Sequence, residues 1–131
     1  MMWSDRYNYY NIQSDEGYTK NVARERLLQL FLNTGNFLQK DHQTLGNADH
    51  FPWLEIVLAE TKDGSFATSE REVPDVNLIA IVCAKGAHID QQVYLKIFLE
   101  IAGALSWKLY LEEDDEGNED VEIKNNMNTY K

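Results

Sequence analysis

The sequence predicts an α+β fold: a two-layer sandwich in which a mainly antiparallel sheet of four to five strands carries two helices on one face. Two observations support this class. Short strand-like segments surround two segments whose apolar residues recur with helical spacing. The order is strand, helix, strand, strand, helix, strand, as in a split βαβ arrangement. With 131 residues, 44% of them hydrophobic, we expect one domain over residues 1–131 whose end frays from about residue 125.

The first predicted strand covers residues 6–13, which read RYNYYNIQ. Aromatic and β-branched residues favour strands. Because side chains alternate along a strand, Tyr10 and Ile12 should share one face. Residues 14–17 (SDEG) then indicate a turn.

The first predicted helix begins at Thr19, a residue type that caps helices, and ends near residue 34. Its main apolar stripe consists of Val22, Ala23, Leu27, Leu30 and Phe31. Gly35 suits the left-handed position just beyond a helix. The periodicity is lost over residues 36–51, where we expect an irregular connection with a few buried residues, such as Phe37 and Leu38.

The middle of the chain predicts three strands. Residues 53–60 alternate in character, with one side formed by Leu54, Ile56 and Leu58. A turn signal at Asp63-Gly64 suggests that residues 65–68 double back as a short strand. Residues 76–85 are apolar almost throughout, which is typical of a strand in the middle of a sheet.

The second predicted helix covers residues 91–106 and is capped by Asp90. Its apolar stripe is long and consists of Val93, Tyr94, Ile97, Phe98, Ile101, Ala102 and Leu105. We expect residues 108–113 to form the next strand. Residues 120–124 should pair with it across a turn at 116–118.

Acidic residues are concentrated in one window. Of the 22 acidic residues, eight lie within residues 112–122, so the rest of the chain has 14 acids against 12 bases and a net charge of −2, compared with −10 overall. A localised negative field attracts cationic partners and repels nucleic acids and anionic membranes. We therefore expect a basic protein partner, and neither a nucleic acid nor a membrane.

Sequence patterns for catalysis, cofactors and metals are not found. The seven glycines are at least eleven residues apart, which excludes glycine-rich phosphate loops. A calcium loop centred on Gly117 would place Ile123 where a Glu ligand is needed. Cys83 is expected to pack as a small hydrophobe. The spacing of the three histidines, His42, His50 and His88, matches no zinc pattern. A histidine-based active site would need two or more of them in one pocket. We expect no enzyme, no cofactor and no metal site.

The expected localisation follows from two features that the sequence lacks, a secretory signal and a long apolar segment. The N-terminus has neither the basic start nor the apolar stretch of a secretory signal, and the longest apolar run is seven residues. We expect a cytoplasmic protein, either a monomer or a homodimer.

Three segments, together with the α+β order, resemble the immunity proteins of bacterial polymorphic-toxin and contact-dependent inhibition systems. They are PWLEIVLAE (52–60), VNLIAIVCAKG (76–86) and EEDDEGNEDVEI (112–123). Such proteins bind a cognate toxin, often a basic nuclease, and block its active site. The resemblance implies a toxin inhibitor whose acids pair with Lys and Arg, with aromatic contact beside them. The expected partner-binding residues are Glu112, Glu113, Asp114, Asp115, Glu116, Glu119, Asp120, Trp107 and Tyr110.

Three alternatives stay open. The acidic window could simply be a solvated hairpin or tail that keeps the protein soluble. The chain is also similar to type III secretion chaperones, which are small, acidic and α+β. They usually end in a helix, whereas this chain ends in NNMNTYK. A dimer built on the apolar face of residues 91–106 would favour this second family. Mimicry of DNA by an anti-restriction protein is a variant of the inhibitor hypothesis.

Overall fold

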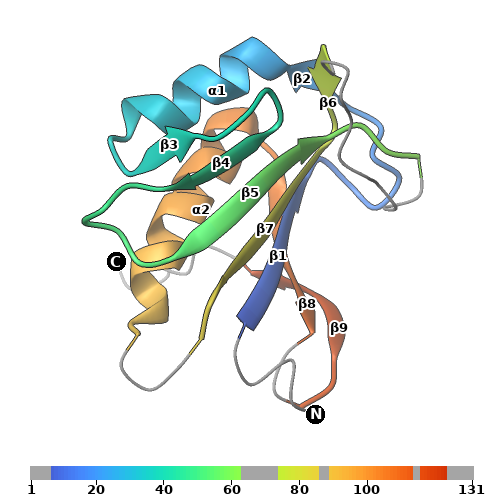
Figure 1. Ribbon diagram of the computed structural model, residues 1–131. Helices are drawn as coiled ribbons and strands as arrows, with labels where there is room; N and C mark the ends of the chain where they lie inside the picture. The colour runs from blue at the N-terminus through green and yellow to red at the C-terminus, as the bar shows by residue number, and fades with distance from the viewer. Residues whose placement is uncertain (1–6, 63–73, 86–88, 114–115, 124–131) are drawn as a thin grey trace, which may run out of the picture.

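The computed structural model describes residues 7–62, 74–85, 89–113 and 116–123. Within these ranges, seven strands form one antiparallel sheet and two helices pack on it (Figure 1). In spatial order the strands are β3 (Phe37–Gln39), β4 (Thr44–Asn47), β5 (Leu54–Ala59), β7 (Leu78–Ala84), β1 (Tyr7–Gln13), β8 (Lys108–Glu113) and β9 (Glu119–Ile123). The helices are α1 (Arg24–Asn33) and α2 (Gln91–Leu105), and a small second sheet pairs β2 (Val22–Ala23) with β6 (Asp75–Val76).

The α+β class, the antiparallel sheet and the two helices are confirmed, but the predicted number of four to five strands is wrong. The additional strands include β3 and β4, which lie in the stretch predicted to be irregular. They have three and four residues. Such short strands show too few alternations for a sequence pattern to reveal them.

The split βαβ arrangement is present around β1. Both β7 and β8 pair antiparallel with β1, one on each side, so they run parallel to each other with β1 between them. Helix α2 connects β7 to β8 across this gap. Ile12 consequently lies between Ile79 and Leu109 at the centre of the sheet. Tyr10 and Ile12 share the buried face, as predicted.

The start of the first helix was predicted wrongly. Helix α1 begins at Arg24, because Val22 and Ala23 pair with β6 instead of entering the helix. Thr19 caps no helix, and its hydroxyl donates to the Asp15 carboxylate. The end of the helix agrees with the prediction, since Gly35 follows it with φ of +77°.

In the stretch after α1, Phe37 is buried as expected but Leu38 is exposed, contrary to the prediction. Both residues belong to β3, so their side chains point to opposite faces of the sheet. Phe37 faces the helices, where its ring lies 5.3 Å from that of Phe31. Leu38 faces the other side, at the edge of the sheet.

The two long strands of the middle region are confirmed as β5 and β7, and β7 is the central strand of the seven. The predicted start at residue 76 is wrong, because β7 begins at Leu78 and Val76 pairs with Val22 in the second sheet. The predicted alternation in β5 is also confirmed, because Leu54, Ile56 and Leu58 are all buried. The short strand predicted at residues 65–68 lies outside the described residues.

Helix α2 supplies much of the core. Asp90 caps it, since its carboxylate accepts a hydrogen bond of 2.9 Å from the Gln92 N–H. The deepest members of its stripe are Tyr94, Phe98, Ile101 and Ala102. Val93, which was predicted to belong to the buried stripe, is exposed. It lies too far round the helix to reach the sheet.

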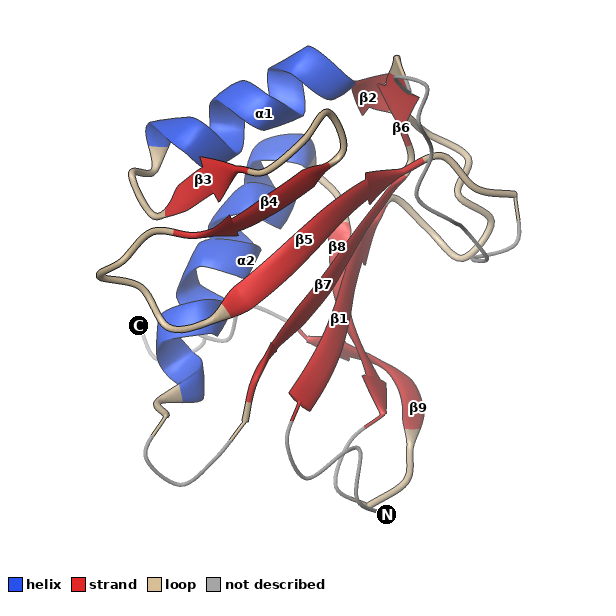
Figure 2. Ribbon diagram, viewed as in Figure 1, coloured by secondary structure: helices blue, strands red, loops and turns tan. Residues whose placement is uncertain are grey.

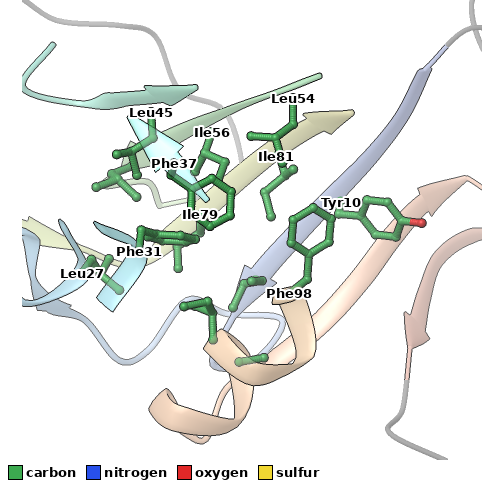
Figure 3. Close-up of a cluster of buried hydrophobic side chains, with 14 of the residues drawn as sticks. Tyr10, Leu27, Phe31, Phe37, Leu45, Leu54, Ile56, Ile79, Ile81 and Phe98 are labelled. Atoms are coloured by element: carbon green, nitrogen blue, oxygen red, sulfur yellow. The ribbon is translucent and has the colours of Figure 1, made fainter. Parts of the chain in front are cut away.

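Both helices pack against the same face of the sheet (Figure 2), and the core fills the space between them. Figure 3 shows Phe31 and Leu27 of α1 at one end of this core and Phe98 of α2 beside Tyr10 at the other. The Tyr10 and Phe98 rings have centroids 5.4 Å apart. A single hydrophobic cluster therefore unites both helices with the sheet.

Candidate functional site

Among the described residues, no helix covers the second face of the main sheet (Figure 2). We call it the open face. The strand registers and the alternation of side chains assign to it these residues: Tyr7, Tyr9, Asn11 and Gln13 of β1, Ala80 and Val82 of β7, Glu55 and Val57 of β5, Lys108, Tyr110 and Glu112 of β8, and Glu122 of β9. Apolar residues lie in the middle of this face, and carboxylates lie along the β8–β9 edge.

Aromatic side chains are exposed toward the end of the open face where β1 and β5 begin. Trp53, directly before β5, is 46% exposed, and Tyr9 is 39% exposed. The Tyr7 ring lies 5.6 Å from the Trp53 indole and supports its position. Half-buried Ala80 and Val82 lie next to β1. Large, rigid and partly exposed aromatic residues of this kind often anchor protein interfaces.

One carboxylate of the open face is already paired. Lys40 Nζ lies 2.8 Å from Glu55 Oε2. The lysine stem crosses Gly46, where an added Cβ would approach the Lys40 Cδ to 3.0 Å, so this glycine makes room for the pair. Exposed ion pairs contribute little stability. The effect here is to neutralise Glu55 and to leave the net negative charge at the opposite edge of the sheet.

That edge is the β8–β9 hairpin, which confirms the pairing predicted for residues 108–113 and 120–124. Leu111 pairs with Val121, and Leu109 pairs with Ile123. Leu111 and Ile123 pack against the core, so this part of the hairpin is held on the scaffold. Lys108 is the one basic residue in the sequence between 108 and 123.

The predicted acidic residues within the described range are all exposed: Glu112, Glu113, Glu116, Glu119 and Asp120. Glu122 is exposed as well and belongs to the same surface. Asp114 and Asp115 lie outside the described residues. We call the described carboxylates of β8, β9 and their turn the acidic hairpin.

The two aromatic residues predicted beside the acids have different surroundings. Trp107 belongs to the hydrophobic core, and its backbone N–H donates to the Ala102 carbonyl at 2.8 Å. Its side chain contributes to folding more than to any surface, so we leave it out of the candidate site. Tyr110 is only 8% exposed, but it borders a hollow on the open face.

This hollow has a volume of about 410 Å³. We call it the Tyr110 hollow. Its walls come from β1, from the loop after β1, and from β8 and β9, and the lining residues are Asn11, Gln13, Glu16, Tyr18, Tyr110, Glu119 and Asp120. The pKa of the Tyr110 phenol is raised by its burial and by the nearby carboxylates of Glu122, Glu16, Asp15 and Asp120. The hollow is therefore strongly negative.

The loop that forms one wall is organised by Asp15. Its carboxylate accepts hydrogen bonds from the N–H groups of Gly17 (3.0 Å) and Thr19 (3.1 Å), and from the Thr19 hydroxyl. These bonds, led by the one from the hydroxyl, lower the pKa of Asp15. Tyr18 adopts a left-handed conformation, and its carbonyl accepts a bond of 3.3 Å from the buried Asn77 amide.

Sequence reasoning identified the hairpin but missed Asn11, Gln13, Glu16 and Tyr18. These residues are about 100 positions away from the hairpin. They reach it only because β1 pairs with β8, which sets Asn11 opposite Tyr110. The Asn11 side chain donates to Glu112 across this pair at 3.4 Å. No local pattern near residue 11 could signal this contact.

The histidines do not assemble into a site within the described residues. His42 borders a surface hollow beside Arg24, whereas His50 hydrogen-bonds Asn36 at 2.9 Å in another loop. His88 lies outside the described residues. Cys83 packs in the core as predicted, and burial raises the pKa of its thiol to about 12. Across the part of the chain that is described, no three His, Cys, Asp or Glu residues are grouped to hold a metal ion.

Among the described residues, neither helix is long and apolar enough to span a membrane. Comparison with known protein families, with curated proteins and with solved structures gives no significant match to this chain.

Proposed function

We propose that this chain is an acidic protein-binding inhibitor, of the immunity-protein kind, that blocks a basic cognate toxin. The observation that carries the proposal is the position of the acidic hairpin, at the edge of the open face, which exposes Trp53 and Tyr9 and is not covered by a helix from the described part of the chain. Such a surface combines a one-sided charge with apolar anchors, which are two features of specific protein interfaces.

The two parts of this surface have different roles in binding. The acidic hairpin attracts a basic protein over a distance of about one Debye length, roughly 10 Å at 0.1 M salt, and so accelerates encounter. Burial of Trp53 and Tyr9 then slows dissociation, because large aromatic side chains contribute most of the binding energy at interfaces. A toxin whose active site binds phosphates offers the complementary positive charge.

The secretion-chaperone alternative receives no support from α2. That hypothesis uses the apolar face of residues 91–106 to join two copies of the chain. In the structure, Tyr94, Phe98 and Ile101 of this face pack on the sheet of their own chain. They are therefore not available to a second copy without unfolding the core.

The proposal is tested by neutralisation. Each protein encoded beside the gene for this chain is expressed in a bacterial host, with and without this chain, and growth is measured. We expect one of these proteins to be basic and toxic, and to be neutralised by this chain. If none of the toxic neighbours is neutralised or bound by the purified chain, the proposal is wrong.

A matched pair of variants locates the binding surface. The double variant Glu112→Lys/Glu122→Lys reverses charge on the acidic hairpin, and Glu60→Lys/Glu100→Lys does so at two exposed positions elsewhere. Each double variant changes the net charge from −10 to −6, because each substitution adds two positive charges. We expect the hairpin variant to slow association at low salt by about tenfold or more, and the control to stay near wild type.

A further inference from the structure

We infer that the Tyr110 hollow receives an arginine side chain of the partner protein. This inference rests on the proposed function and specifies the chemistry of recognition at that surface. A guanidinium would enter between β1, the loop after β1 and the acidic hairpin, where Tyr110 forms part of the lining.

The charge of the hollow favours a cation. Three of its seven lining residues are acidic, namely Glu16, Glu119 and Asp120, and none of the seven is basic. Asp15 and Glu122 add negative charge close enough to raise the pKa of Tyr110. A concave surface with charge of one sign concentrates the field inside it, so a cationic side chain gains more here than on the flat part of the sheet.

The Tyr110 hydroxyl provides an observation that does not depend on charge. The side chain is more than nine-tenths buried and borders the hollow. Within the described residues, its hydroxyl makes no hydrogen bond. The hydroxyl oxygen is not among the fully buried side-chain atoms that lack a partner, so it reaches the surface of the hollow, where it can accept a hydrogen bond. A guanidinium N–H that enters the hollow is a donor for it.

The two amide side chains of the hollow present further acceptors. Asn11 uses its Nδ2 group to donate to Glu112, and Gln13 uses its Nε2 group to donate to the Asp15 carbonyl at 2.9 Å. Their side-chain oxygens are left as acceptors. Together with the carboxylates and phenols, they make a lining that accepts hydrogen bonds from several directions.

This lining suits a guanidinium better than an ammonium group or a metal ion. A guanidinium has five N–H donors in a plane and stacks on aromatic rings, such as those of Tyr18 and Tyr110, whereas an ammonium is a compact point charge. A metal ion needs three or more ligands at one point, and the described carboxylates are not grouped in that way. A hollow of about 410 Å³ also has room for a planar side chain.

The test uses a small probe, so it does not require the toxin. N-acetyl-arginine N-methylamide is titrated into the 15N-labelled full chain, and amide chemical shifts are followed by NMR. N-acetyl-citrulline N-methylamide has the same shape without the charge, and the corresponding lysine derivative has the charge without the planar donors. We expect saturable binding of the arginine probe on the order of millimolar, with shifts at Asn11, Tyr110 and Asp120.

Variants then identify the contacts. Tyr110→Phe should weaken arginine binding by about threefold to tenfold, because it removes one acceptor. Asp120→Asn should weaken it at least as much, and asparagine tolerates the left-handed backbone of this residue (φ of 51°). Glu60→Gln removes an exposed carboxylate outside the hollow and should leave arginine binding unchanged. Unchanged thermal unfolding confirms that the variants are folded.

The outcomes separate this inference from the proposed function. Equal binding of the arginine and citrulline probes, equal binding of the lysine probe, or shifts away from the hollow would each overturn the inference. A toxin neutralised equally well by wild type and by Tyr110→Phe/Asp120→Asn would also overturn it, while the proposed function would stand. Specific binding of the arginine probe, with no toxin neutralised, would support this inference and refute the proposed function.

Discussion

Asn77 holds three segments together from a buried position, and its removal should destabilise the protein measurably. Its Oδ1 accepts the Thr61 N–H at 2.8 Å, and its Nδ2 donates to the Thr61 carbonyl at 2.8 Å and to the Tyr18 carbonyl at 3.3 Å. Asn77 is 8% exposed. We predict that Asn77→Ala lowers the free energy of unfolding by about 2–4 kcal/mol.

The magnitude follows from the groups that lose a partner. Each buried peptide group that loses its hydrogen bond costs about 1–3 kcal/mol, and the two bonds to Thr61 are both buried. The bond to Tyr18 is only partly buried, so water replaces it at little cost. The costs for the two Thr61 groups add up, and we expect the lower half of the resulting range, because a water molecule can enter the space left by the amide.

Asn47 supplies the control. Its side chain also makes three hydrogen bonds to the backbone, with Ala48, Phe51 and Leu54, but in a partly buried loop. We expect Asn47→Ala to cost only about 1 kcal/mol, since water can reach these groups. Urea unfolding followed by tryptophan fluorescence measures both variants. If Asn77→Ala costs no more than Asn47→Ala, burial is not what makes the Asn77 bonds important.

Three further predictions concern local features of the fold. Gly35→Ala should lower the free energy of unfolding by about 1–2 kcal/mol, because Gly35 has φ of +77°. Gly103→Ala in α2 should instead raise it by about 0.5–1 kcal/mol, because an added Cβ meets nothing within 4 Å. Denaturant unfolding of both variants checks that the two changes have opposite signs. Burial raises the pKa of Cys83 to about 12, so a disulfide reagent should react with the folded protein orders of magnitude more slowly than with the urea-unfolded chain, and equal rates would contradict this reasoning. The hydrogen bonds of Asp15 lower its pKa below the ordinary 3.8, so its carboxylate stabilises the folded state above pH 3.8 and loses this effect as the pH falls through the lower, folded value. Asp15→Asn should therefore be less stable than wild type at pH 7, and the difference should shrink in acid; a difference that grows in acid would show that the sign is wrong.

Elements with a long, regular pattern were predictable from sequence. Residues 91–106 have a helical period over four turns and a capping Asp90, and α2 agrees within one residue. Residues 108–113 form β8 with the predicted bounds. Shorter elements were not predictable. Strand β3 pairs with β4, and β4 pairs with β5, and a segment of three or four residues is too short to show such pairing in its sequence.

The first helix shows that a clear local pattern can also predict the wrong structure. Val22 and Ala23 continue the helical stripe of the sequence, yet they pair with β6, about 50 residues further along the chain. The backbone hydrogen bonds of that pairing compete with a helical turn. Local propensity is weak in comparison with a tertiary contact of this kind.

The sequence alone determined the charge of the candidate surface and its place in the chain, because the acids of residues 112–122 are adjacent and follow a strand whose pattern is clear. Only the tertiary structure decided what surrounds them. The pairing of β1 with β8 brings Asn11 and the loop after β1 to Tyr110. Folding also places Trp107 in the core, whereas Trp53 and Tyr9 stay exposed. The physical reason is that charge is a property of each residue, whereas a hollow needs walls, and these walls come from segments about 100 residues apart that meet only when the sheet forms.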